Sequence, residues 1–244
     1  MDYQIHNIDW NDEKVKRFWD FYNNYQPFED LWFSKTVGRE VIKFVSQHTK
    51  IKGDILDYGI GKGHLAAYLM EDPEVKLSAC DFSEDTIKNI NTKLASFQNF
   101  KGCFLVKGFP SSFQENQFDV VFLVEAIEHL TDDYLFPTFT EIKRILKPGG
   151  VIVVTTPNSE NLAMQNVCCP DCGCVFHRVQ HVRSFDKDNL TDIMAKHSFQ
   201  TMFCEAIDFE DYGKKRTIKL IKNLVRPLLG IKKYTPHLIY IGKK

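Results

Sequence analysis

The sequence lacks a long hydrophobic run, an excess charge of one sign and a leader-like start. Its 244 residues are 43% hydrophobic, yet no apolar segment approaches the roughly 20 residues that a membrane-spanning helix needs. The formal net charge of −1 provides no overall basic field for nucleic acid. Residues 1–10 contain no apolar stretch typical of a signal peptide. We therefore expect one sizeable core in a cytoplasmic protein without a nucleic-acid partner.

Internal repeats and low-complexity linkers are also missing, and strand and helix patterns alternate from residue 51 onward. Short apolar runs predict strands at 55–58, 75–80, 104–106, 119–124, 151–155, 201–207 and 237–241. Amphipathic patterns predict helices at 64–70, 83–94, 133–147 and 186–197. This alternation predicts an α/β fold with a doubly wound, mostly parallel sheet of seven strands. Such sheets bind ligands at the carboxyl ends of their strands.

The predicted sheet divides the chain into a cover and a main domain. Residues 1–48 carry two aromatic-rich helical patterns and predict a helical cover. Residues 49–244 form the main domain, with a Cys/His insertion at 159–185 and a basic insertion at 209–235. The aromatic residues of the cover either roof a pocket or belong to the core.

A glycine-rich turn follows the first predicted strand, in the run Asp57-Tyr58-Gly59-Ile60-Gly61-Lys62-Gly63. Glycines let the backbone turn sharply and approach a ligand closely, because no Cβ intervenes. Asp81 ends the next strand, twenty positions after Gly61, a spacing that suits an acid bound to ribose hydroxyls. The third glycine comes one position too early for a dinucleotide-binding fingerprint, which disfavours a dehydrogenase.

These features resemble the class I methyltransferases, which use S-adenosylmethionine (SAM) and have a Rossmann-like methyltransferase fold. The resemblance covers residues 50–208 and rests on the glycine run and on Asp81-Phe82-Ser83, Phe118-Asp119-Val120-Val121 and Leu146-Lys147-Pro148-Gly149-Gly150. It implies that Gly59, Gly61 and Gly63 hold the amino-acid part of SAM, that Asp81, Phe82 and Ser83 lie at the ribose, and that Gly108 and Phe109 lie at the adenine. Many members place an acid where Lys107-Gly108-Phe109 stands here. Asp57, just before the loop, complements the positive sulfonium.

The fourth predicted strand runs into Glu125-Ala126-Ile127-Glu128-His129. This run resembles the ubiquinone-pathway O-methyltransferase branch. On a helical turn Glu125 and Glu128 would share one face. We expect Glu125 to contact SAM, and Glu128 and His129 to be catalytic, with His129 as a candidate base. The alternative is that Glu128 and His129 only hydrogen-bond the loops.

Residues 168–181 read Cys-Cys-Pro-Asp-Cys-Gly-Cys-Val-Phe-His-Arg-Val-Gln-His. Cys169 and Cys172 have zinc-knuckle spacing, and His177 and His181 follow four residues apart, so these four predict a structural zinc site. Cys168 or Cys174 could replace a histidine. His181 also opens a His181-Val-Arg-Ser-Phe185 pattern that similar methyltransferases carry beside the active site, so it is a catalytic candidate as well.

Residues 214–233 contain eight lysines or arginines and no acids, with apolar residues at helical spacing. Such a segment either touches an anionic membrane surface or is a solvated face of the fold. Taken together, the sequence predicts methyl transfer to a small-molecule, glycan or lipid-linked acceptor, at oxygen. The alternative is a catalytically silent SAM-fold protein whose zinc-stabilised module binds a partner.

Overall fold

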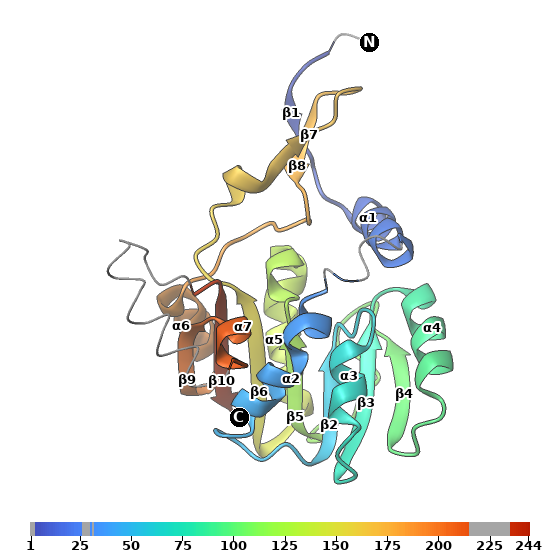
Figure 1. Cartoon of the computed structure of the whole chain (residues 1–244), viewed down its shortest axis with the longest axis vertical. Coiled ribbons are helices and arrows are strands. Elements are labelled where there is room, and N and C mark those ends of the chain that lie inside the picture. Colours follow the sequence, from blue (N-terminus) through green and yellow to red (C-terminus); the bar gives the residue numbers. More distant parts are fainter. Residues whose placement is uncertain (1–2, 26–29, 31, 215–234) are drawn as a thin grey trace.

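A computed structural model describes residues 3–25, 30, 32–214 and 235–244. Its centre is a seven-stranded sheet in the order β4-β3-β2-β5-β6-β10-β9 (Figure 1). The strands are β2 (Gly53–Tyr58), β3 (Val75–Asp81), β4 (Phe100–Leu105), β5 (Phe118–Val124), β6 (Leu146–Pro157), β9 (Gln200–Ile207) and β10 (His237–Lys243). This sheet confirms the predicted doubly wound, mostly parallel architecture.

Strand β10 gives the sheet its mixed character, because it runs antiparallel to both neighbours while β2 to β6 pair in parallel. His237, its first residue, pairs with Pro157 at the end of β6 and with Ile207 at the end of β9. The beginning of β10 therefore lies at the same edge as the carboxyl ends of the parallel strands. That edge is where an α/β sheet binds its ligands.

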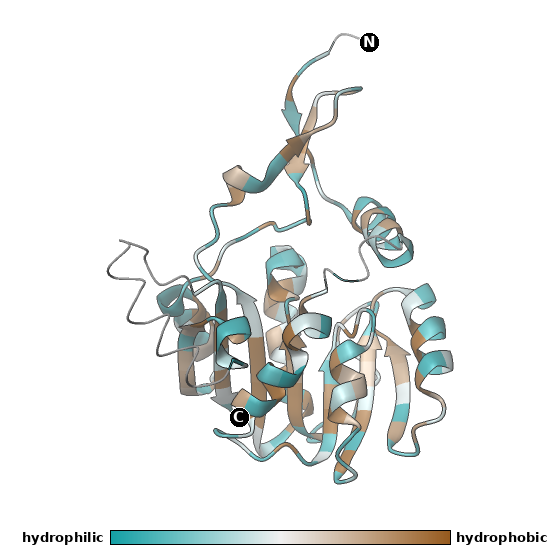
Figure 2. Ribbon diagram, in the orientation of Figure 1, coloured by the Kyte–Doolittle hydropathy of each residue, from teal (hydrophilic) through white to brown (hydrophobic). Residues whose placement is uncertain are grey.

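Helices cover both faces of this sheet, so successive strand residues enter different cores. Ile55 packs in one core and Leu56 in the other, and both side chains are fully buried. The first core receives α2 (Phe33–Val45), α3 (His64–Leu69), α4 (Glu84–Leu94) and α7 (Phe209–Tyr212), and the second receives α5 (Asp132–Ile145) and α6 (Lys187–Lys196). The strands are accordingly hydrophobic along most of their length, whereas the helices present polar outer faces (Figure 2).

A small second sheet stands apart from the main one, in the order β1-β8-β7 (Figure 1). It joins β1 (His6–Asn7) in parallel with β8 (Cys174–His177), which pairs antiparallel with β7 (Asn166–Cys168). The predicted helical cover thus contains helix α1 (Asp12–Asn24) and α2, but also strand β1, which pairs with a strand of the Cys/His insertion. That pairing was not expected, because its two halves lie far apart in the sequence.

Several boundaries differ from the prediction. The helix expected at 133–147 ends at Ile145, because Leu146 already pairs with Phe118 as the start of β6. The strand expected at 104–106 begins at Phe100 and pairs in parallel with β3, with a register shift after Leu77. The basic segment at 214–233 lies outside the described residues, apart from Lys214. Within the described ranges, no helix has the length and apolar character to cross a membrane.

Candidate cofactor and acceptor site

The glycine run forms a tight turn between β2 and α3. Gly59, Gly61 and Gly63 all have positive φ, at 80°, 51° and 74°, which a residue with a Cβ adopts only with strain. A Cβ on Gly63 would also lie 2.8 Å from the Ile90 side chain. The backbone N–H of Gly61 donates to Asp81 Oδ2 at 3.3 Å. The two predicted parts of the cofactor site, the loop and the acid of the next strand, are therefore in direct contact.

Two buried carboxylates lie beneath this loop without a compensating cation. Asp57 is 3% exposed, and its Oδ2 has no hydrogen-bond partner. Burial, together with the nearby Asp81 charge, raises the pKa of Asp57 to about 7. Burial also raises the pKa of Asp81 to about 6, although the backbone N–H groups of Ser83 and Gly61 oppose the shift. The loop is therefore preorganised for a ligand that brings positive charge or hydroxyl donors.

The remaining predicted cofactor residues border the same turn. Ser83 is buried and caps α4 by accepting from Thr86 N–H, while the neighbouring Phe82 ring is exposed. Gly108 follows β4 and has open space where a Cβ would lie. Phe109 is partly buried in the same segment. The positions of Phe82, Gly108 and Phe109 leave their surfaces accessible beside the ends of β3 and β4.

The N-terminal region covers this loop. The Trp32 ring lies 3.4 Å from where a Cβ of Gly61 would be. The Lys62 ammonium donates to the Asn23 carbonyl at the end of α1. Asn23 also donates from Nδ2 to Thr86 Oγ1 at 3.5 Å. Part of the aromatic cover therefore roofs the predicted cofactor position.

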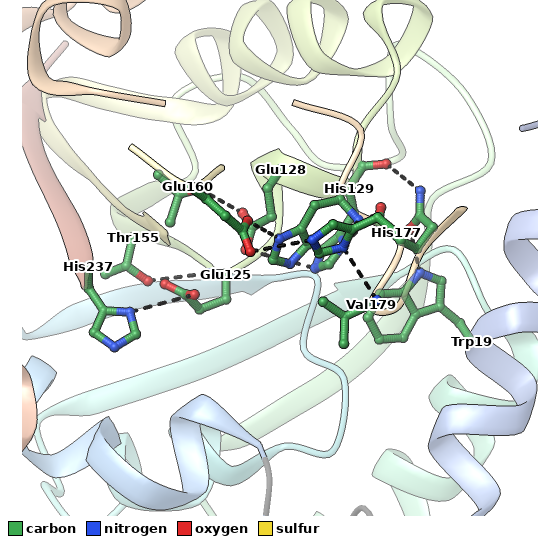
Figure 3. Close-up of polar contacts among 12 residues, drawn as sticks. Trp19, Glu125, Glu128, His129, Thr155, Glu160, His177, Val179 and His237 are labelled. Carbon is green, nitrogen blue, oxygen red and sulfur yellow. Dashed lines mark hydrogen bonds and ion pairs between the residues drawn. The ribbon is translucent and has the colours of Figure 1, made fainter. Parts of the chain in front are cut away.

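Glu125 directly follows β5 and adopts a positive φ of 47°, which is strained for a residue with a side chain. Its N–H donates to the Thr155 carbonyl at 3.0 Å, so the end of β6 holds the backbone. Burial raises the pKa of its carboxyl group to about 8. Its Oε1 is buried without a partner, and its Oε2 lies 3.9 Å from His237 Nδ1 (Figure 3).

Because of this conformation, Glu125 and Glu128 do not share a helical face as expected. Glu128 belongs to a separate 3-10 turn, Ile127–His129. Its side chain is 2% exposed, and Oε2 accepts from Thr156 Oγ1 at 2.9 Å while Oε1 has no partner. Burial, with a contribution from Glu125, raises the pKa of Glu128 well above its usual value.

His129 lies beside Glu128, with Nε2 3.8 Å from Glu128 Oε1. Its Nδ1–H donates to the Gln180 carbonyl at 3.4 Å, which leaves Nε2 as the nitrogen with a lone pair. Burial and the nearby His181 lower the pKa of His129 to about 3. His129 is therefore a neutral imidazole and only a weak proton acceptor at neutral pH.

The Cys/His insertion brings two more histidines to this place. His181 donates from Nδ1 to Glu160 Oε2 at 2.5 Å, and its ring lies 4.8 Å from the His129 ring. His177 stacks on His181 at 4.5 Å and faces Glu160 Oε1 across 3.4 Å. The backbone N–H of His181 donates to His177 Nδ1 at 3.2 Å. One carboxylate therefore contacts two imidazoles, of which His181 also lies close to Glu128.

Gln180 joins three elements in this cluster. It is fully buried with a positive φ of 60°. Its Nε2 donates to the His129 carbonyl at 3.0 Å, and its Oε1 accepts from Trp19 Nε1 at 2.9 Å. The Trp19 ring packs edge-on against His129 at 4.8 Å. The insertion, the turn after β5 and helix α1 therefore together enclose the His129 ring.

In the part of the chain that the structure describes, two sets of donor atoms lie close enough for a metal ion. Glu128, His129 and His181 form one, and Glu160, His177 and His181 form the other, each within 4.8 Å. The first set fits a divalent cation better, because both of its histidines use Nδ1–H elsewhere and keep Nε2 free to coordinate. In the second set His177 Nδ1 accepts hydrogen bonds, so its Nε2 carries the proton.

The structure does not assemble the zinc site predicted from Cys169, Cys172, His177 and His181. Among the described residues, no set of donor atoms within 4.8 Å combines these thiols with these imidazoles. Strand β8 separates them, with the thiols at the hairpin turn and His177 at the strand's other end. The prediction is therefore corrected: the thiol pair lies before β8, and His177 lies at its far end. The seven cysteines are free, and Cys80, Cys103 and Cys204 are buried.

Sequence reasoning missed Glu160, Gln180 and His237. None of them belongs to a motif, and each reaches the site through a contact with a residue at least 21 positions away. A polar residue at the start of an apolar strand was the available signal for His237.

Comparisons with known proteins agree with this geometry. The family described as "Methyltransferase domain" matches residues 55–150, which span β2 to the start of β6. Residues 55–150 therefore resemble a methyltransferase domain, and they lie within a Rossmann-like methyltransferase fold.

Individual relatives share that class. A Mycolicibacterium smegmatis protein named "Probable S-adenosylmethionine-dependent methyltransferase" is 30% identical over 130 residues, covering 53% of this chain and 47% of its own. A demethylmenaquinone methyltransferase from Staphylococcus aureus is 29% identical over 152 residues, covering 62% and 58%. The chain thus spans about half the length of the curated relatives it matches.

Solved structures show the same fold. A Burkholderia thailandensis 1,6-didemethyltoxoflavin-N1-methyltransferase, solved with 1,6-didemethyltoxoflavin and S-adenosylhomocysteine, superposes with a TM-score of 0.68. It covers 98% of this chain and 94% of its own at 15% identity. At this level of identity the likeness supports the fold alone.

Proposed function

We propose that this chain binds SAM and transfers its methyl group to a small-molecule, glycan or lipid-linked acceptor, at an oxygen atom. The observation that carries the proposal is the contact between the glycine loop and the acid of the next strand, Gly61 N–H to Asp81. The unsatisfied Asp57 carboxylate beneath the loop supports a cationic cofactor. The silent binding protein is not favoured, because the matched relatives carry methyltransferase names.

Cofactor contacts follow from the positions around the loop. Gly59, Gly61 and Gly63 hold the amino-acid part of SAM, and Asp57 and Glu125 face its positive charge. Asp81, Phe82 and Ser83 bind the ribose, and Gly108 and Phe109 flank the adenine. The exposed Phe82 ring and the open space at Gly108 support the last two contacts.

Acceptor contacts come from Glu128, His129 and His181, which meet above the end of β5. In a methyl transfer the acceptor must approach in line with the bond between the methyl carbon and sulfur, so alignment accounts for much of the catalysis. The tautomer-fixed Nε2 of His129 is a ready hydrogen-bond acceptor for a hydroxyl. The enclosing Trp19 ring supports an acceptor with an apolar surface.

The test uses SAM with a labelled methyl group, added with pure protein to a fractionated cell extract. We expect label in a small-molecule, saccharide or lipid fraction, and none with the variant Asp81→Asn. Asp192→Asn, an exposed change on α6, serves as the matched control. SAM binding without label in any fraction would contradict the proposed transfer, and absence of SAM binding would contradict the cofactor.

We further propose that Cys169 and Cys172 hold structural zinc at the β7–β8 turn. Backbone N–H groups of Cys172 and Asp171 lower the pKa of the Cys169 thiol, which favours the thiolate that zinc requires. Zinc in protein purified without chelator should be lost in the double variant Cys169→Ser, Cys172→Ser. Zinc retained by that variant would place the ion at Glu128, His129 and His181, and zinc-free wild type would refute both sites.

The predicted contact of residues 214–233 with an anionic membrane stays a proposal. Its support is the sequence alone, eight basic residues without an acid. Retention on vesicles with anionic lipids at low salt would support it, and failure to bind would refute it.

A further inference from the structure

Glu125 and His237 face each other at the carboxyl edge of the sheet, where two buried polar atoms lack partners. Among the described residues, Glu125 Oε1 and His237 Nδ1 have no hydrogen-bond partner, and Nδ1 lies 3.9 Å from Glu125 Oε2. Such unsatisfied groups are costly unless a ligand completes them. Glu125 also keeps a positive φ of 47°, a strained conformation of the kind that gathers at functional sites.

The pair lies next to the cofactor loop. Ala126, the residue after Glu125, has its Cβ 3.6 Å from where a Cβ of Gly59 would be. The Glu125 and His237 side chains keep 17% and 23% of their exposure, in contrast to 2% for Glu128. A ligand on the glycine loop can therefore reach Glu125.

Aromatic rings fix the imidazole on its other sides. Phe33 of α2 packs 4.6 Å from the His237 ring and Phe209 of α7 packs 6.1 Å from it. His237 is the first residue of β10, and its pairing with Pro157 fixes its position at the carboxyl edge of the sheet. Glu125 is likewise held by its N–H bond to Thr155. Both partners are thus positioned by strands rather than by free loops.

On these grounds, and resting on the proposed function, we propose that Glu125 balances the sulfonium charge of SAM and then takes the proton of the acceptor, with His237 as its positioning residue. In the step, a lone pair of the acceptor oxygen forms a bond to the methyl carbon. The carbon–sulfur bond breaks, and its electron pair stays on sulfur. The sulfonium thereby becomes a neutral thioether, and the hydroxyl proton passes to the Glu125 carboxylate.

The charge balance gives the reason for this assignment. While SAM is bound, its positive sulfur favours the ionised form of Glu125. Methyl transfer removes that charge, so the buried carboxylate is left uncompensated and binds a proton more tightly. Proton uptake thus becomes favourable at the moment the reaction releases a proton. His237 Nδ1 lies 3.9 Å from Oε2, so a small approach would let it donate to the ionised carboxylate and keep that carboxylate from holding its proton too early.

Other titratable groups also face this pair. The charge of Glu160 raises the pKa of Glu125. The charge of Glu125 in turn raises the pKa of Glu128. Asp208, which precedes α7, acts on His237. Asp57 is the second carboxylate beneath the loop that can respond to a cation. A decisive experiment must therefore separate Glu125 from these acids.

Calorimetric titration of the full chain with SAM and with S-adenosylhomocysteine makes this separation. The two ligands differ by the methyl group and its charge, so protons released by SAM beyond those released by S-adenosylhomocysteine report the sulfonium. Titrations in two buffers of different ionisation enthalpy count these protons. At pH 7 we expect an excess approaching one proton, about 0.9 for a carboxyl group with a pKa of about 8.

The variants decide the assignment. Glu125→Gln should abolish the excess, whereas Glu205→Gln, a β9 control paired with Lys187, should retain it. His237→Leu should weaken SAM binding about tenfold at pH 7 while S-adenosylhomocysteine binding stays within about threefold, and His237→Asn should restore it by supplying an N–H donor. An equal loss for both ligands would reduce His237 to a structural role.

Two results would overturn the proposal while leaving the proposed function standing. One is equal proton release with SAM and S-adenosylhomocysteine in the wild type. The other is an excess that survives Glu125→Gln but disappears in Asp57→Asn. If neither ligand binds, the proposed function itself fails.

Discussion

Replacing Asp57 by Asn should stabilise the ligand-free protein and weaken its hold on SAM. Asp57 is 3% exposed, and Oδ2 has no hydrogen-bond partner. Asn keeps the shape of the side chain but removes the charge that burial disfavours. The buried charge of Asp57 therefore destabilises the ligand-free protein, although we propose that this residue serves the cofactor.

The magnitude follows from the change in pKa. The pKa of Asp57 rises from 3.8 to about 7 on folding, so the folded state prefers the protonated form. Stability is lost as pH rises from the unfolded value through the folded value, at about 1.4 kcal/mol per pH unit. The loss is complete above about pH 7 and amounts to at most ~4 kcal/mol. Between pH 5 and pH 7 the advantage of the Asn variant should grow by about 2 kcal/mol.

Urea unfolding of both proteins at pH 5, 6, 7 and 8 measures this advantage directly. The control is Asp192→Asn, whose carboxylate is exposed on α6, so its effect should not grow over this pH range. SAM should then raise the melting temperature of the wild type more than that of Asp57→Asn. An Asn variant that gains no stability between pH 5 and pH 7 would show that Asp57 is already compensated, and the electrostatic reasoning would fail.

Three further perturbations test other parts of the structure. Gly63→Ala places a Cβ 2.8 Å from Ile90 at a φ of 74°. It should lower the free energy of unfolding in urea by about 1–3 kcal/mol and abolish SAM binding measured by calorimetry. Unchanged SAM binding would contradict the role of the loop. His129→Ala removes one hydrogen bond to the acceptor, so it should lower turnover by about tenfold while SAM affinity changes by less than about threefold. His197→Ala, at the C-cap of α6, is the control. Unchanged turnover in an assay with labelled SAM would remove His129 from the acceptor site. Gly173→Ala places a Cβ 2.3 Å from the Gln4 carbonyl. It should release β1 from β8 and expose residues 3–10 to limited proteolysis. A wild-type cleavage pattern would mean that the backbone at this contact shifts without breaking the pairing.

The sequence predicted the sheet and the glycine turn after β2 well, because both depend on local patterns. The strands of a parallel sheet are nearly all apolar, and the turn after β2 needs glycines where φ is positive. Asp81 could be placed for the same reason, since it ends a recognisable strand at a fixed distance from the loop.

The acceptor side could be predicted only in part. Glu128, His129 and His181 were found from short motifs, and the structure brings these three together. The zinc motif was assigned across β8, because spacing along the chain does not reveal that an extended strand separates residues 172 and 177. The positive φ of Glu125 carries no sequence signal, since neither glycine nor asparagine occupies that position.

The contacts of Glu160 and His237 could not be read from the sequence for a different reason. Each depends on the register between strands and on loops that return from a distant part of the chain. His237 meets Glu125 across 112 positions only because β10 lies beside β6 and starts at its end. Such contacts result from the completed fold.

The position of β10 also has a consequence for synthesis on the ribosome. Although β10 follows β9 in the chain, it lies between β6 and β9 in the sheet. Until residues 237–243 emerge, β6 has an unpaired edge and β9 has no strand to join. The nascent chain therefore presents an open, apolar strand edge until β10 is made, and such an edge can pair with the strands of other chains.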